Sequence, residues 1–329
     1  MTDVPANPAN EAPAPGEEPA QVARQGRAVP WLTSALLALN VAVAAGIQVS
    51  GGRSALQQWG WKPAFEVWRG KAWVLVTSAF VHLDALHLVL NLYWLWVLGG
   101  IVEQILPRTR MAAFVFAAAA VSSAAQLALT DQTGIGFSGV CYALFGLAWV
   151  VSALRPDLGI RVPPRLFGLF AVWLVLGFVG TWLKIVNFGN VAHLAGGLFG
   201  ACAGLAMAPR WQQLGLGGIG GMAAATIAAA AWAPWSPSWT AARAISAYER
   251  ADHASALRWL DAASRRGQDP AWVAEMKALA HAQQGQVDAA RVDLAVLRSL
   301  NRARAEELAR KLAIPDISET SPQTAPRAK

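Results

Sequence analysis

The chain has 329 residues, of which 55% are hydrophobic and 14% charged, and its formal net charge is +7. An average soluble domain carries about 25% charged residues, and the mean hydropathy here is +0.36. This composition excludes an ordinary soluble globule, a wholly disordered chain and a coiled coil. Two cysteines are too few for a disulfide-stapled secreted domain. The positive charge does not call for a nucleic-acid partner, because lysine and arginine gather in the cytoplasmic loops of membrane proteins.

The first 29 residues are rich in proline and alanine and offer little apolar surface for burial. We expect residues 1–29 to form a disordered N-terminal tail. They lack the basic segment and apolar run that together mark a secretory signal peptide.

Seven apolar runs follow, each close to the roughly 20 residues that a helix needs to cross about 30 Å of hydrocarbon. Because lipid satisfies no backbone N–H or C=O group, each run should be a helix. We therefore predict an all-α polytopic membrane bundle with a six-span core over 30–210, a seventh span within 211–236 and a small soluble helical region after it. The runs cover 31–49, 85–106, 111–129, 138–154, 166–183, 190–208 and 214–235.

The charges of the loops predict how the spans are oriented. Arginines lie in the tail before the first run and in the loops after the second, fourth and sixth runs. These segments share one side of the membrane, so this side and the N-terminus should be cytoplasmic. The loop over 50–84 departs from the trend with four basic residues. It also holds four of the 16 tryptophans, so we expect it to lie in the membrane interface.

Residues 237–313 are more polar, and their pattern is that of amphipathic helices. Ala256 and Leu260 recur as Ala290 and Leu294, an offset of 34 residues, which is the tetratricopeptide period. An unrelated amphipathic helical hairpin is the alternative interpretation. After seven spans this region falls on the outer side, where it can bind a protein partner. Residues 314–329 should form a disordered tail.

Three polar constellations interrupt the apolar runs, where ionisable residues are costly and usually functional. The first holds His82, His87 and Asn91, and the last two lie four residues apart on one helix face. The second opens the fourth span with Gly136-Phe-Ser-Gly-Val-Cys-Tyr142, and the third opens the sixth span around His193. Spans two, four and six all begin at the outer side, so the three constellations should lie at similar depth.

This pattern favours nucleophilic chemistry. A serine hydroxyl is a poor nucleophile until a base takes its proton, and His193 is the candidate base for Ser138. Glycines at every fourth position of the sixth span, and small residues on the fourth, would let the two helices approach closely. The glycines are Gly196, Gly200 and Gly204, and Gly139 begins the facing row.

The neighbouring polar groups complete the candidate site. Tyr142 lies one turn after Ser138 and can pack against the ring of His193. The side chains of His87 and Asn91, and the amide of Ser138, can donate hydrogen bonds to an oxyanion. Asp84 is the only acid near this depth and is not placed to complete a triad, so we predict a dyad of Ser138 and His193.

In this order and spacing the motifs resemble those of the rhomboid intramembrane serine proteases over about residues 30–210. The resemblance implies an endopeptidase that cleaves single-span membrane proteins near their outer ends, in the lipid bilayer and without a cofactor. It assigns the nucleophile to Ser138, the base to His193 and the oxyanion hole to His87, Asn91 and the Ser138 amide. The supporting positions that it implies are Tyr142, His82, Gly136, Gly139 and Gly196.

Two further positions bear on this resemblance. Gly99 and Glu103 resemble the family's glycine-x3-glutamate at the inner end of the second span, and we expect Glu103 to satisfy helix-end or loop groups. Trp73-Val74 departs from the family, which often has Trp-Arg in the first loop. The resemblance and the lack of an organellar presequence predict a bacterial inner membrane protein.

The same residues are compatible with other functions. An inactive rhomboid-like protein that binds membrane clients is the main alternative, although both dyad residues are present. A transporter with a histidine–asparagine relay is weaker because intramembrane carboxylates are few. Three histidines at one depth could bind zinc, but there is no HExxH motif, so we predict no metal.

Two minor predictions concern packing. Cys141 and Cys202 lie roughly 9 Å apart in depth at 1.5 Å per helical residue, so both should be free thiols. Gly217 and Gly221 in the seventh span should pack onto the core, with dimerisation as the alternative.

Overall fold

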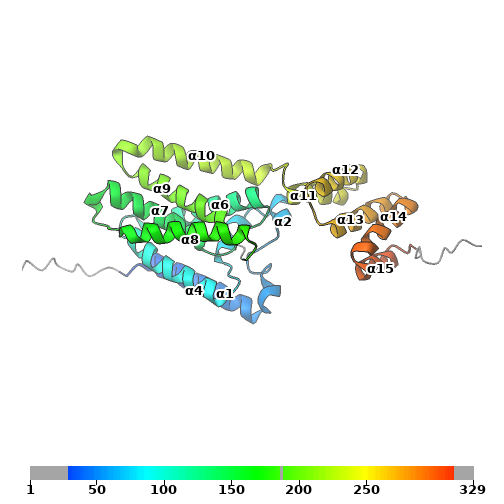
Figure 1. Cartoon of the computed structure of the whole chain (residues 1–329), viewed down its shortest axis with the longest axis horizontal. Helices are drawn as coiled ribbons and strands as arrows, with labels where there is room; N and C mark the ends of the chain where they lie inside the picture. Colours follow the sequence, from blue (N-terminus) through cyan, green and yellow to red (C-terminus); the bar gives the residue numbers. More distant parts are fainter. Residues whose placement is uncertain (1–28, 186–187, 315–329) are drawn as a thin grey trace, which may run out of the picture.

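The computed structural model describes residues 29–185 and 188–314 (Figure 1). Every regular element in these ranges is a helix, which confirms the predicted all-α membrane bundle. The two predicted disordered tails lie outside the described residues, apart from their innermost positions.

Each of the seven predicted spans coincides with an apolar helical stretch. Five stretches are long and apolar enough to cross a membrane, and the helices that open at Ser138 and Asn190 are shorter, with 17 residues each. The second span contains a π-helical segment, Leu95–Gly99, which the apolar pattern did not predict. The elements are α1 (Trp31–Val49), α4 (Ala85–Trp94), α5 (Gly100–Val102), α6 (Arg108–Thr130), α7 (Ser138–Leu154), α8 (Pro164–Trp182), α9 (Asn190–Ala206) and α10 (Gln212–Ala231).

The predicted loop over 50–84 contains short helices. Two of them are α2 (Ala64–Trp68) and α3 (Val74–Thr77), and Ser78–Phe80 forms a 3₁₀ turn. Their lengths of five residues or fewer leave no room for a periodic apolar pattern, so the sequence offered little signal for them. Three more 3₁₀ turns cover Gly52–Ala55, Pro156–Leu158 and Pro209–Trp211.

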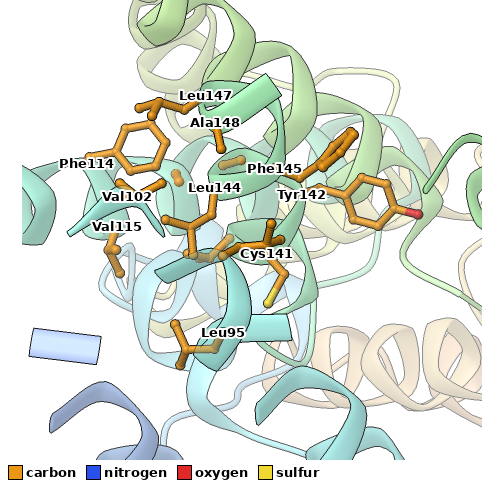
Figure 2. Packing of buried hydrophobic residues seen from close by; sticks show 14 of the residues in the cluster. Leu95, Val102, Phe114, Val115, Cys141, Tyr142, Leu144, Phe145, Leu147 and Ala148 are labelled. Carbon is orange, nitrogen blue, oxygen red and sulfur yellow. The ribbon is translucent and has the colours of Figure 1, made fainter. Parts of the chain in front are cut away.

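The core of the bundle is α7, most of whose side chains are buried. Its partner is α9, and glycines bring the two helices into backbone contact. A Cβ atom added to Gly146 would collide with the backbone of Gly197, and one added to Gly200 would collide with that of Ala143. Figure 2 shows α7 side chains such as Leu144 packing among apolar residues of the neighbouring helices.

The helix of the predicted seventh span, α10, packs along α9, but through glycines other than those predicted. Gly215 lies against the backbone of Ala206, and Gly218 lies against Cys202. Gly217 and Gly221 have open space where a Cβ would stand, so the prediction that these two pack onto the core is wrong. An apolar run predicts a membrane helix, but it does not indicate which face of that helix packs against a neighbour. Both cysteines are free, as predicted.

The carboxylate of Glu103 caps the first span from a distant part of the chain. Its Oε1 accepts from the amide of Leu32 at 2.8 Å, and its Oε2 accepts from the amide and hydroxyl of Thr33, both at 2.8 Å. The first amides of a helix lack partners within it, and the helix dipole favours a negative charge there. Glu103 thus has the structural role that we predicted.

The C-terminal region forms five helices beyond the end of the bundle at which α2 lies (Figure 1). Successive pairs pack as hairpins, and α12 begins at His253 while α14 begins 34 residues later at Val287. The turns repeat too, because Ala251 and Gly285 both have positive φ, at 59° and 71°. The helices are α11 (Pro237–Glu249), α12 (His253–Arg265), α13 (Pro270–Gln283), α14 (Val287–Leu300) and α15 (Arg302–Lys311).

This arrangement has the 34-residue register of the predicted repeat. The tetratricopeptide assignment itself, like the domain boundaries, stays a prediction. We call residues 237–314 the C-terminal module below.

Candidate active site

The hydroxyl of Ser138 lies 2.7 Å from Nε2 of His193. Ser138 is the first residue of α7, and His193 lies in the first turn of α9 with 7% of its surface exposed. The two helices start at the same end of the bundle, and glycines let them pack together along their length. The pair that the sequence singled out is therefore within hydrogen-bonding distance.

Two of the predicted glycines lie at this contact. A Cβ on Gly196 would collide with the carbonyl oxygen of Gly139, and a Cβ on Gly139 would come within 2.7 Å of the Cβ of Ser122. Neither position has room for a side chain, so Gly196 allows α9 to approach the first turn of α7, and Gly139 allows α6 to approach the same turn.

The ring of Tyr142 stacks on the imidazole of His193. Their centroids are 4.7 Å apart and their planes differ by 12°. The Tyr142 hydroxyl donates to the carbonyl oxygen of Phe170 on α8 at 3.2 Å, which fixes the far edge of the ring. Figure 2 shows Tyr142 at the edge of the buried cluster with its hydroxyl directed away from it. Because the stack and the hydrogen bond act on one ring, Tyr142 limits how the His193 ring can turn.

His87 reaches the same place from α4. A Cβ on Gly136 would collide with the His87 ring, so the ring lies directly against this glycine, two residues before Ser138. The φ of Gly136 is 97°, a conformation that side-chain-bearing residues rarely adopt. Glycine is required there both by the backbone and by the neighbouring ring.

The other predicted positions surround His87. The Nδ2 of Asn91 donates to the His87 carbonyl at 2.9 Å, and it lies near Gly136 as well. The His82 ring meets the His87 ring edge-on at 5.0 Å, and its Nδ1 lies 3.2 Å from the carbonyl oxygen of Phe80. Asp84 caps α4 by accepting from the His87 amide at 2.8 Å.

Sequence reasoning missed two polar side chains of α6. The Oε1 of Gln126 accepts from the amide of Ala192 at 3.1 Å, directly before His193, and so holds the first turn of α9. Ser122, one turn earlier, is buried between Gly139 and Gly196. The signal was available, because Ser122 and Gln126 are four residues apart in a span whose other residues, Ser123 excepted, are apolar. In the described part of the chain, no group of three or more His, Cys, Asp and Glu side chains could hold a metal ion.

The fold and the arrangement of these side chains define a polytopic helical membrane protein with a serine–histidine pair at one end of the bundle. Residues 68–210 match the model of the Rhomboid domain. The chain therefore carries a Rhomboid domain over these residues.

Curated relatives of the chain are named rhomboid proteases. The chain is 31% identical over 172 residues to the rhomboid protease GlpG of Photorhabdus laumondii, covering 51% of this chain and 58% of the relative. It is 32% identical over 169 residues to that of Pectobacterium atrosepticum and 28% identical over 173 residues to that of Yersinia pestis, covering 51% of this chain and 60% of each relative. The chain thus spans somewhat more than half the length of the relatives that it matches.

Proposed function

We propose that the chain is an intramembrane serine endopeptidase, with Ser138 as nucleophile and His193 as general base. The observation that carries the proposal is the 2.7 Å contact between Oγ of Ser138 and Nε2 of His193. This distance is within the reach that a base needs to take a serine proton. The Rhomboid domain and the rhomboid proteases among its relatives support the same activity.

Acylation begins when Oγ of Ser138 attacks the carbonyl carbon of the scissile bond and its proton passes to Nε2 of His193. The C=O electron pair moves onto oxygen and forms a tetrahedral oxyanion. As this intermediate collapses, the C–N bond breaks and the imidazolium gives its proton to the leaving nitrogen. A water molecule then attacks the ester, its proton passes through Nε2 to Oγ, and the carboxylic acid product leaves.

The oxyanion would be stabilised by the amide of Ser138 and the side chains of His87 and Asn91. The Ser138 amide belongs to the first turn of α7, whose amides have no partner within the helix. The contact of the His87 ring with Gly136 supports a role for His87 beside the nucleophile. Asn91 donates to its own helix in this state, so its part requires Nδ2 to turn towards the oxyanion.

The supporting roles follow from the contacts. Tyr142 orients the imidazole of His193 by stacking on it, and His82 supports the loop before α4. Gly196 allows α9 to approach α7 at the two reacting side chains, and Gly139 allows Ser122 of α6 to pack against the same turn.

The proposed substrates are single-span membrane proteins in a bacterial inner membrane, cleaved near the outer face. The charge distribution among the loops supports a cytoplasmic N-terminus. In that orientation the first turns of α7 and α9 face outwards, and water would reach Ser138 from that side. The C-terminal module would then lie on the outer side, available to a protein partner.

Labelling with a fluorescent fluorophosphonate probe tests the proposed pair. The wild-type protein in detergent should be labelled, whereas Ser138→Ala and His193→Ala should not. Ser152→Ala is the matched control, because Ser152 lies at the other end of α7, where its hydroxyl accepts from the amide of Val162 at 3.0 Å. Labelling that persists in Ser138→Ala would refute the assigned nucleophile. A folded wild type that resists two probe chemistries would favour the client-binding alternative.

A further inference from the structure

The corner between α6 and α7 is bound to the C-terminal module. Asp131 ends α6 with a φ of 57°, and its carboxylate extends to the first turn of α11. One oxygen accepts from the hydroxyl of Ser236. The other accepts from the amide of Ser238 at 3.1 Å and from its hydroxyl at 2.7 Å. A residue of the membrane bundle therefore caps a helix more than 100 positions later in the chain.

The charge of Asp131 suits this place. The N-terminal turn of a helix presents unpaired amides and the positive end of the helix dipole, both of which favour a carboxylate. Ser236 is almost fully buried and is the N-cap of α11 itself, because its Oγ also accepts from the amide of Trp239 at 2.9 Å. Asp131 thus binds a cap that is already formed.

The contact is reciprocal. The indole Nε1 of Trp235 donates to the carbonyl oxygen of Ala128 at 2.7 Å, in the last turn of α6, where carbonyls lack helical partners. The end of α6 and the beginning of α11 therefore satisfy each other's free backbone groups. A second attachment lies nearby, because Arg69, directly after α2, pairs with Glu249 at the end of α11.

The corner leads directly to the proposed nucleophile. Seven residues after Asp131 the chain reaches Ser138, and hydrogen bonds to other loops help to hold the segment between them. The hydroxyl of Thr133 donates to the Lys62 carbonyl at 2.9 Å, and the amide of Gly136 donates to the Ser78 carbonyl at 3.2 Å. The module holds the start of a short segment whose other end carries Ser138.

We propose that Asp131 is a positioning residue through which the C-terminal module holds the corner before Ser138 and so raises the reactivity of this serine. The inference rests on the proposed function, since it concerns the same nucleophile. It implies that displacement of α11 by a bound partner slows the reaction at Ser138.

The test uses full-length Asp131→Gly in detergent. Glycine removes the carboxylate and adopts positive φ without strain, so the helix end keeps its conformation. We expect the rate of fluorophosphonate labelling of Ser138 to fall roughly threefold to tenfold, which corresponds to losing part of a charge-assisted contact. The probe is small, so its rate does not depend on how a protein substrate is recruited. Asp131→Asn, which keeps the shape and one acceptor, should recover part of the rate.

The matched control is Asp252→Ala. Asp252 caps α12 inside the module by accepting from the amide of Ser255 at 3.0 Å. Its removal should leave the labelling rate within about twofold of wild type, because the loss of a single cap weakens α12 without releasing Asp131. Equal losses in the two variants would show a general effect of module stability and overturn the assignment to Asp131.

A double-mutant cycle with Ser238→Ala shows whether the two residues act together. If Asp131 works through α11, Asp131→Gly and Ser238→Ala should not be additive, and the double variant should label no more slowly than Asp131→Gly. Additive losses would contradict the coupling.

Hydrogen exchange in residues 132–140 provides a readout that needs no activity. Exchange there should be faster in Asp131→Gly than in wild type and unchanged in Asp252→Ala. Suppose that the wild type is labelled, and that Asp131→Gly is labelled as fast as the wild type and exchanges no faster. The positioning role of Asp131 is then contradicted, while the proposed function stands. If the wild type is not labelled, the proposed function is contradicted. If hydrogen exchange in residues 132–140 is also unchanged in Asp131→Gly, the coupling between the C-terminal module and this segment is contradicted as well.

Discussion

The membrane bundle and the C-terminal module stabilise their helices in different ways. In the module, four of the five helices begin with a side chain that accepts from their own first-turn amides, namely Ser236, Asp252, Asp269 and Asn301. In the bundle, α1, α6, α7, α8, α9 and α10 have no such local cap. There, glycines allow backbones to touch, and a distant carboxylate such as that of Glu103 caps a helix end.

The difference reflects the two environments, which are lipid around the bundle and water around the module. Association of helices in lipid gains little from burying apolar side chains and depends on close packing. A short helix in water is marginal by itself, so caps and a packed amphipathic face decide whether it forms. The substitutions below should therefore have effects that depend on the region in which they are made.

The largest effect should come from the backbone contact between α7 and α9. Gly200→Leu places a side chain against the backbone of Ala143, which cannot move away without separating the helices. We expect a loss of about 3 kcal/mol or more in unfolding free energy, or failure to fold. Gly220→Leu is the control, because nothing lies within 4 Å of a Cβ at that position of α10. Thermal unfolding in detergent compares them, and equal losses would contradict the role of close packing.

A smaller effect is expected at the distant cap of α1. Glu103→Ala leaves the amides of Leu32 and Thr33 without their partner and should cost about 2 kcal/mol, as for hydrogen bonds to a charged group. Denaturant titration in mixed micelles would measure the loss. Gln104→Ala should be nearly neutral, since its side chain is exposed and bonds to its own helix at Gly100. A neutral Glu103→Ala would show that lipid-facing helices do not depend on such caps.

A local cap in the module should contribute less. Asp269 accepts from the amides of Ala271 and Trp272, both at 3.2 Å, and Asp269→Ala should cost the module about 1 kcal/mol. Asp288→Ala removes an exposed carboxylate that pairs with Arg291 and should stay within about 0.5 kcal/mol of wild type. Hydrogen exchange of α13 and α14 would separate the two. Equal exchange rates in Asp269→Ala and Asp288→Ala would contradict the stabilising role of the local cap.

The smallest effect concerns pH. Hydrogen bonding with Ser255 lowers the pKa of Asp252 from its ordinary value. A carboxyl with a lowered folded-state pKa stabilises the module at pH values above its ordinary pKa, and this contribution is lost as pH falls through the folded-state pKa. Acidification from pH 6 to pH 3 should therefore loosen α12 more in wild type than in Asp252→Asn, as followed by circular dichroism. Identical acid profiles would contradict a role for this carboxylate.

The spans were predictable because crossing a membrane requires a length and an apolar composition that show directly in the sequence. The proximity of Ser138 and His193 could be inferred because glycine rows on two spans indicated close contact at matching depth. Which glycines of α10 pack could not be inferred, since Gly215, Gly217, Gly218 and Gly221 look alike in an apolar run. The roles assigned to the site residues stay predictions.

The contacts that cross between regions were also hidden. From the sequence, Asp131 is an ordinary loop residue. Its hydrogen bonds with Ser236 and Ser238 depend on how the chain after α10 packs against the end of α6. Gln126 is one polar residue in a largely apolar helix, and only the packing of α9 beside it shows that it accepts from the amide of Ala192. Such long-range partners have no fixed spacing, so no local pattern reveals them.

The shortness of α7 and α9 has a consequence for the lipid around them. Seventeen residues at about 1.5 Å each extend roughly 25 Å, several ångströms less than the hydrocarbon thickness of about 30 Å. A bilayer adapts to a short span by thinning locally or by letting water and headgroups reach deeper beside it. Acyl-chain length should therefore influence the protein, because it determines how far below the headgroups the hydroxyl of Ser138 lies.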